Sequence, residues 1–291
     1  MYDLSPKHEY FIGVDSDGCV FDTMELKHKE CFIPNIINFY DLQAISKFAR
    51  EAAEFVNLYS KSRGINRFPA LIETLQWLQK RPEVLARGVN VRIPQPLVDW
   101  MSRETKLGNP ALEQEVQASG DRDLKRALEW SKAVNVSVAN MVRGVPPFPM
   151  VRQSLERLAK HADIVVCSAT PNDALNAEWE EHDLRKYVVA ICGQESGSKK
   201  EILSNASKFA PSKSLMIGDA PGDYKAAAAN RILFYPINPG AEDASWKRFY
   251  DEAIDKFLQG GYAGAYQQEL LREFESYLPE SPPFSTVQTK N

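Results

Sequence analysis

The sequence predicts an open α/β fold with a parallel, doubly wound sheet and an inserted all-helical domain. Apolar runs typical of buried strands occur at 11–15, 164–168, 187–192, 214–218 and 231–237. Amphipathic helical patterns separate the later runs, as expected for a parallel sheet with right-handed crossovers. Between the first and second runs, positions 24–145 carry helical patterns and almost no strand signal. These three observations favour one sheet interrupted by a helical insertion.

The first predicted strand ends in a group of acids. The apolar residues 11–14 are followed at once by Asp15, and Asp17 comes two residues later. Because residues i and i+2 of a strand point the same way, we expect these carboxylates side by side at the end of the strand. Gly18 then lets the chain turn. Adjacent carboxylates repel each other, so the pair predicts a bound divalent cation.

The insertion over 24–145 is expected to be a separate helical domain. Its predicted helices lie near 41–61, 69–80, 94–105, 110–119 and 121–143. It ends at Gly144-Val145-Pro146-Pro147, a stiff stretch typical of a hinge. The other predicted parts are a core domain over 1–23 and 146–278, with C-terminal helices near 245–259 and 262–277, and a disordered tail over 279–291.

Polar residues also follow the later strands. They are Ser168 at the end of IVVCS, Lys199 and Lys200 after the glycine-containing turn at 193–198, and Asp219 and Asp223 in GDAPGD. The carboxyl ends of parallel strands meet at one edge of the sheet, where ligands bind. A nucleophile, a hydroxyl donor, a lysine and further carboxylates at that edge predict phosphoryl transfer through an aspartyl-phosphate. Taken singly, Asp17 is also explained as a turn residue, and Asp223 as a helix N-terminal acid.

In this order the motifs resemble those of the haloacid dehalogenase superfamily of phosphohydrolases. That family has a strand ending D-x-D-G, a strand ending in Ser or Thr, a lysine, and then G-D-x-x-x-D. The resemblance covers 11–23 and 150–237, and the insertion is similar to that family's first type of helical cap. It implies a Rossmann-like core and a Mg²⁺-dependent hydrolase of small phosphate monoesters. A phosphomutase of the same chemistry, or a non-catalytic phospho-acceptor similar to receiver domains, is the alternative.

The resemblance also implies roles for the acids. Asp15 would attack phosphorus, and Asp17 would protonate the leaving oxygen and then take a proton from water. Magnesium would bind the Asp15 carboxylate, the Asp17 backbone carbonyl and Asp219. Asp223 would orient the lysine or a metal-bound water.

The phosphoryl oxygens would be held by Ser168, by backbone N–H groups at Ala169 and by the lysine. Lys199 fits the family spacing better than Lys200, although a shift of one residue exchanges the two. Thr170 follows Ala169, where phosphoglycolate phosphatases commonly have Asn, which argues against that particular activity.

One loop of the insertion, SRGINRF, is a candidate for substrate binding. Arg63 and Arg67 are four residues apart, and Gly64 lets the backbone turn between them. A guanidinium there could bind a second anionic group of the substrate through paired hydrogen bonds. A solvated loop without a functional role is the alternative.

The composition excludes several other classes of protein. With 44% hydrophobic and 25% charged residues and a net charge of −4, the chain reads as a soluble globular protein without general affinity for nucleic acid or anionic membranes. No signal peptide or membrane span is evident in the sequence, so we expect a cytoplasmic protein whose partner is a small phosphorylated metabolite. The cysteines are expected to be reduced and buried, and the histidines show no metal-type spacing. The sequence does not predict the oligomeric state.

Overall fold

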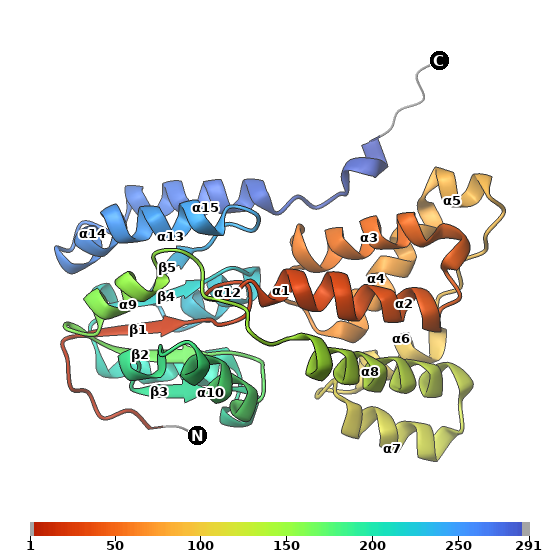
Figure 1. The fold of residues 1–291 in the computed structure, drawn as a ribbon, viewed down its shortest axis with the longest axis horizontal. Helices are drawn as coiled ribbons and strands as arrows, with labels where there is room; N and C mark the ends of the chain where they lie inside the picture. Colours follow the sequence, from red (N-terminus) through yellow and green to blue (C-terminus); the bar gives the residue numbers. More distant parts are fainter. Residues whose placement is uncertain (1–2, 287–291) are drawn as a thin grey trace. The chain divides into compact units, whose positions relative to one another are not determined.

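In the computed structural model, which describes residues 3–286, the chain divides into two compact units (Figure 1). The core unit comprises Met1–Met24 and Arg143–Leu278, and the helical unit comprises Glu25–Val142 and Pro279–Asn291. Among the described residues, no helix is both long and apolar enough to cross a lipid bilayer.

Within residues 3–286, five strands form one parallel sheet in the order β3–β2–β1–β4–β5, as Figure 1 shows. The strands are β1 (Tyr10–Val14), β2 (Ala162–Cys167), β3 (Ala190–Cys192), β4 (Ser214–Gly218) and β5 (Leu233–Pro236). This arrangement confirms the predicted doubly wound α/β fold. The third strand is shorter than predicted, because the chain over Arg185–Tyr187 forms a 3-10 turn instead.

Helices cover both faces of the sheet. They are α9 (Val151–Leu158), α10 (Asn172–Glu181), α11 (Lys199–Leu203), α12 (Pro221–Ala229), α13 (Glu242–Arg248), α14 (Ile254–Leu258) and α15 (Ala265–Tyr277), with shorter 3-10 or π-helical segments at Gln194–Ser196, Ser204–Lys208, Pro211–Lys213 and Phe249–Ala253. Alternate residues of β1 face opposite ways, as a strand requires. Ile12 and Val14 pack with α9, α13 and α14, whereas Phe11 packs with α11, α12 and α15. Because the sheet is buried on both faces, its strands read as continuous apolar runs.

The helical unit has its own hydrophobic core, which includes the fully buried side chains of Trp100 and Trp130. Its helices are α1 (Thr23–Leu26, which begins in the core unit), α2 (Ile33–Phe39), α3 (Ser46–Leu58), α4 (Arg67–Lys80), α5 (Pro82–Ala86), α6 (Gln95–Arg103), α7 (Asn109–Ser119) and α8 (Arg122–Met141), with a π-helical segment at Lys27–Phe32 and a 3-10 turn at Gln43–Ile45. The sequence did not predict α1, α2 or α5.

The chain after α15 differs from the expected disordered tail. Pro283–Thr286 forms a 3-10 turn, and the Phe284 ring lies 4.1 Å from the Arg81 guanidinium and 6.5 Å from the Trp77 ring. Arg81 is itself stacked on Phe48 at 4.4 Å. Phe284 therefore packs against a cationic and an aromatic side chain. The composition of this stretch does not predict these contacts. The rest of that prediction, 287–291, lies outside the described residues.

Candidate active site

The central strand and its neighbours bring polar residues from distant parts of the chain to one edge of the sheet. Val14 is in register with Val166 of β2 and with Ile217 of β4. Asp15, the next residue, donates its backbone N–H to the Ile217 carbonyl at 3.0 Å. The turn after β1 therefore lies between the turns that follow β2 and β4, as the parallel register requires.

Lys199 connects two of these turns. Its Nζ lies 2.5 Å from Oδ2 of Asp15 and 2.5 Å from Oδ1 of Asp223. The lysine is the first residue of α11, whose N-terminus is capped by reciprocal hydrogen bonds between Ser198 and Glu201. Lys200 is exposed, so the structure places Lys199 rather than its neighbour against the carboxylates.

Asp223 is fully buried in the first turn of α12. Its Oδ2 accepts hydrogen bonds from the backbone N–H groups of Asp219 at 3.2 Å and Ala220 at 3.0 Å, while Oδ1 faces Lys199. Gly218 makes this geometry possible, because a Cβ there would lie 2.5 Å from the Asp223 side chain. Asp223 thus fixes the turn after β4 and orients the lysine.

Three buried carboxylates meet here, since ligand oxygens of Asp15, Asp219 and Asp223 all lie within 4.8 Å of one another. Burial raises the pKa of Asp15 well above its usual range, although Lys199 opposes this effect. Burial also disfavours the Lys199 ammonium, but Asp15 and Asp223 outweigh it and raise the pKa of Lys199 well above its ordinary value. Lys199 is therefore protonated, and a single ammonium faces several acidic groups.

The donor set suits a hard divalent cation. Carboxylate oxygens are the ligands that Mg²⁺ prefers, and the cluster carries more negative charge than one lysine can offset. Within the cluster, Asp223 is held by Lys199 and by the backbone N–H groups of Asp219 and Ala220, and Asp15 accepts hydrogen bonds from Lys199 and from the Ser16 N–H. The residues present therefore fit the Mg²⁺ expected from the sequence.

Asp17 is half-buried, and its two carboxylate oxygens face two threonines. Thr23 Oγ1 donates to Oδ1, and Thr170 Oγ1 donates to Oδ2 at 2.6 Å. The sequence pattern does not predict a role for either threonine at the site. No spacing rule pairs residues 17 and 170, so their contact emerges only from the fold.

The turn after β2 is built around Ser168. This side chain is buried, and its Oγ accepts the backbone N–H of Thr170 at 3.2 Å. The Ser168 N–H donates to the carbonyl of Cys192, while Ala169 is exposed. Ser168 thus shapes the turn in which the phosphate-binding groups were expected.

Ser16, between the two acids of the first motif, is also held in place. Its Oγ accepts the indole N–H of Trp179 at 3.0 Å and lies 3.3 Å from Oε2 of Glu178. Helix α10 therefore supports the turn that carries Asp15 and Asp17.

Arg63 and Arg67 make contacts inside the helical unit. Arg63 is only 2% exposed and donates to the carbonyl of Leu58 at 2.8 Å. Arg67 donates to Ser131 Oγ at 2.9 Å and to Asn135 at 2.7 Å, and its guanidinium lies 5.1 Å from the centre of the Phe32 ring. Burial lowers the pKa of Arg67. These contacts give both arginines a structural role.

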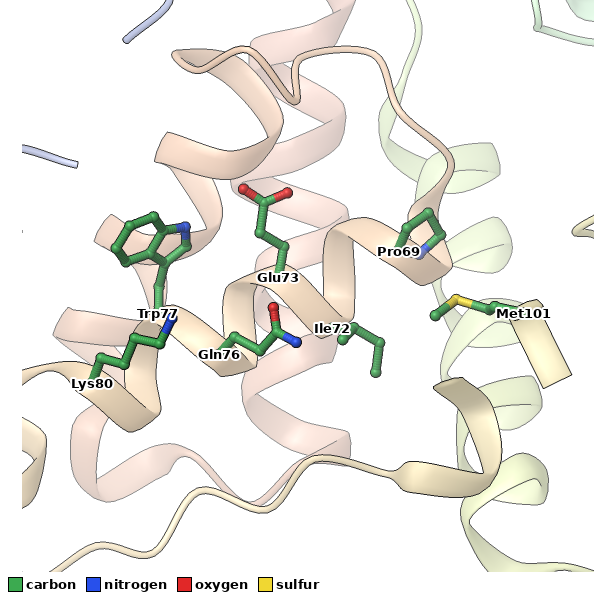
Figure 2. Close-up of a pocket in the computed structure, with 7 residues that line it drawn as sticks. All are labelled: Pro69, Ile72, Glu73, Gln76, Trp77, Lys80 and Met101. Carbon is green, nitrogen blue, oxygen red and sulfur yellow. The ribbon is translucent and has the colours of Figure 1, made fainter. Parts of the chain in front are cut away.

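An open pocket lies elsewhere on the helical unit, and Figure 2 shows the side chains around it. It is lined by Pro69, Ile72, Glu73, Gln76, Trp77 and Lys80 of α4 and by Met101 of α6. None of the residues singled out from the sequence lines it, and Phe284 approaches its edge at Trp77.

No family model matches the chain. The tryptophan synthase alpha chain of Cyanidium caldarium is 30% identical over 137 residues, and the match covers 40% of this chain and 52% of that protein. The chain thus spans about half the length of the curated relative it matches.

Solved structures with a similar arrangement include a haloacid dehalogenase-like hydrolase from Streptococcus pneumoniae, with 11% identity, a TM-score of 0.46, and coverage of 82% of this chain and 90% of that one. A HAD-superfamily hydrolase of subfamily IA from Geobacter sulfurreducens has 14% identity, a TM-score of 0.39, and coverage of 80% and 89%. Scores at this level do not transfer an activity. The chain itself resembles the haloacid dehalogenase superfamily in the order of its motifs, and the structure brings Asp15, Lys199, Asp219 and Asp223 together at one edge of its sheet.

Proposed function

We propose that this protein is a phosphohydrolase of the haloacid dehalogenase type, which transfers the phosphoryl group of a small phosphate monoester to Asp15 and then to water. The observation that carries the proposal is the Lys199 ammonium, 2.5 Å from both Asp15 and Asp223, in a cluster that also contains Asp219. A buried carboxylate beside a fixed cation can act as a nucleophile towards an anionic phosphoryl group.

In the first step, a carboxylate oxygen of Asp15 forms a bond to phosphorus while the bond from phosphorus to the ester oxygen breaks. Asp17 gives its proton to that leaving oxygen. In the second step, water attacks the phosphorus of the aspartyl-phosphate, and Asp17 takes the proton of this water. The bond to Asp15 breaks, and inorganic phosphate leaves.

The other residues of the site bind the phosphoryl group and stabilise its negative charge. Lys199 faces the oxygens on which negative charge builds up, and Ser168 with the N–H groups of its turn binds the phosphoryl oxygens. Asp15, the backbone carbonyl of Asp17 and Asp219 would hold Mg²⁺. The bound cation would neutralise the repulsion between the nucleophile and the phosphate.

The proposal is tested by hydrolysis of p-nitrophenyl phosphate with Mg²⁺. The parent protein should release p-nitrophenol, and Asp15→Asn should lower kcat by about three orders of magnitude or more, because it removes the nucleophile and little volume. Asp22→Asn is the matched control, since Asp22 belongs to the same segment and is exposed. A parent protein without turnover, or an Asp15→Asn variant within about tenfold of it, would refute the mechanism.

A further inference from the structure

The Asp17 carboxylate is held by hydroxyl groups from two segments that lie far apart in the sequence. Thr23 donates to Oδ1, and Thr170, 153 positions after Asp17, donates to Oδ2 at 2.6 Å. The second distance is typical of a hydrogen bond from a hydroxyl to a carboxylate. These two hydrogen bonds therefore fix the orientation of the Asp17 carboxylate.

The backbone around Thr170 is fixed as well. Its N–H donates to Ser168 Oγ at 3.2 Å, and its carbonyl accepts the N–H of Gln194 at 3.0 Å. A Cβ on Gly193 would lie 2.3 Å from that carbonyl oxygen, so the two turns pack directly against each other. The β-branched side chain of threonine is restricted at χ1, which limits the positions that its hydroxyl can take on this fixed backbone.

We propose that Thr170 is a positioning residue for Asp17, an inference that rests on the proposed function. The two steps require Asp17 first as an acid and then as a base. The Thr170 hydroxyl can donate to Oδ2 whether Asp17 is a carboxylate or a carboxylic acid, so it holds Asp17 in the same place in both states and leaves the proton of the acid for the leaving oxygen.

The test compares two esters that differ in how much their leaving oxygen depends on a proton. p-Nitrophenolate leaves readily without one, whereas phenolate is a poorer leaving group and depends more on the acid. The variants are Thr170→Val, which replaces the hydroxyl with a methyl group of similar size, and Thr170→Ser, which keeps the hydroxyl. Thr74→Val is the matched control, because Thr74 is buried and donates to a backbone carbonyl within α4.

Thr170→Val should lower kcat for phenyl phosphate by about tenfold or more and kcat for p-nitrophenyl phosphate by less than about threefold, with KM unchanged. Thr170→Ser should recover most of the loss, and Thr74→Val should lose little on either ester. Melting temperatures measured alongside report any loss of fold.

Equal losses of kcat on both esters would assign Thr170 to phosphate binding or to the stability of the turn. They would overturn this inference but leave the proposed function standing. Unchanged kcat on both esters would do the same. A parent protein that hydrolyses neither ester would overturn the proposed function and this inference with it.

Discussion

Lys199 and Asp15 form an ion pair at 2.5 Å although 184 positions separate them in the chain. The same ammonium reaches Asp223, so one side chain connects the turn after β1, the start of α11 and the first turn of α12. Only 22% of the Lys199 side chain is exposed, and loss of its charge would leave buried carboxylates without their cation. The residue is therefore expected to support both turnover and folding.

Lys199→Met should lower kcat by about two to three orders of magnitude, the effect typical of removing one fixed group that stabilises the transition state. It should also lower the free energy of unfolding by about 3 kcal/mol in the absence of Mg²⁺, because a buried ion pair has lost one partner. Lys200→Met is the control and should change neither quantity. Phosphatase assays measure kcat, and urea unfolding measures the free energy of unfolding. A larger loss of either quantity in Lys200→Met than in Lys199→Met would contradict the choice of Lys199 as the lysine of the site.

Magnesium should raise the melting temperature of the parent protein and be required for its activity. A cation that binds the folded chain more tightly than the unfolded one stabilises it, and here it would also relieve repulsion among the clustered acids. Asp219→Asn should reduce both the thermal shift and the activity at a given Mg²⁺ concentration. Asp183→Asn, at an exposed position, should behave like the parent. Full activity in excess EDTA would exclude the metal from the reaction.

Gly218→Ala should disturb Asp223 without replacing any titratable group. The added Cβ would lie 2.5 Å from the Asp223 side chain, so the carboxylate must move away from Lys199. We expect destabilisation by about 1–3 kcal/mol, typical of an overpacked site, together with a clear loss of turnover. Gly222→Ala is a close control, because nothing lies within 4 Å of its Cβ position. If the two variants had similar stability and turnover, Gly218 would not be needed to position Asp223.

Arg67→Ala should destabilise the helical unit. It removes hydrogen bonds to Ser131 and Asn135 and the contact with the Phe32 ring, a loss of about 2 kcal/mol. Arg122→Ala, at an exposed position, is the control. Urea unfolding measures the structural effect. An increase in KM confined to substrates with a second anionic group, with stability unchanged, would instead support the substrate contact expected from the sequence.

The sequence was informative where buried strands end. Apolar runs located the strands of the sheet, and the parallel topology then implied that Asp15, Ser168 and Asp219 share an edge. The helices before Tyr40 were harder to predict. The π-helical turn at Lys27–Phe32 breaks the 3.6-residue recurrence of apolar side chains, and Pro34 follows directly in α2.

Contacts that depend on tertiary structure had no signature in the sequence. Threonines are common near strand ends and in turns, so nothing marked Thr23 and Thr170 as partners of Asp17. The guanidinium of Arg67 was expected at a surface loop, but in the structure it donates to residues of α8, 64 and 68 positions later. The choice between Lys199 and Lys200 likewise required the orientation of α11.

The described residues before β1 belong to the core unit, whereas Pro279–Ser285 belongs to the helical unit. The native cysteines are all buried, so a thiol-reactive dye would label cysteines introduced at the exposed Ser5 and Ser281 in preference to them. Energy transfer between dyes at Ser5→Cys and Ser281→Cys would then report whether the distance between the two labelled sites changes as ligands are added.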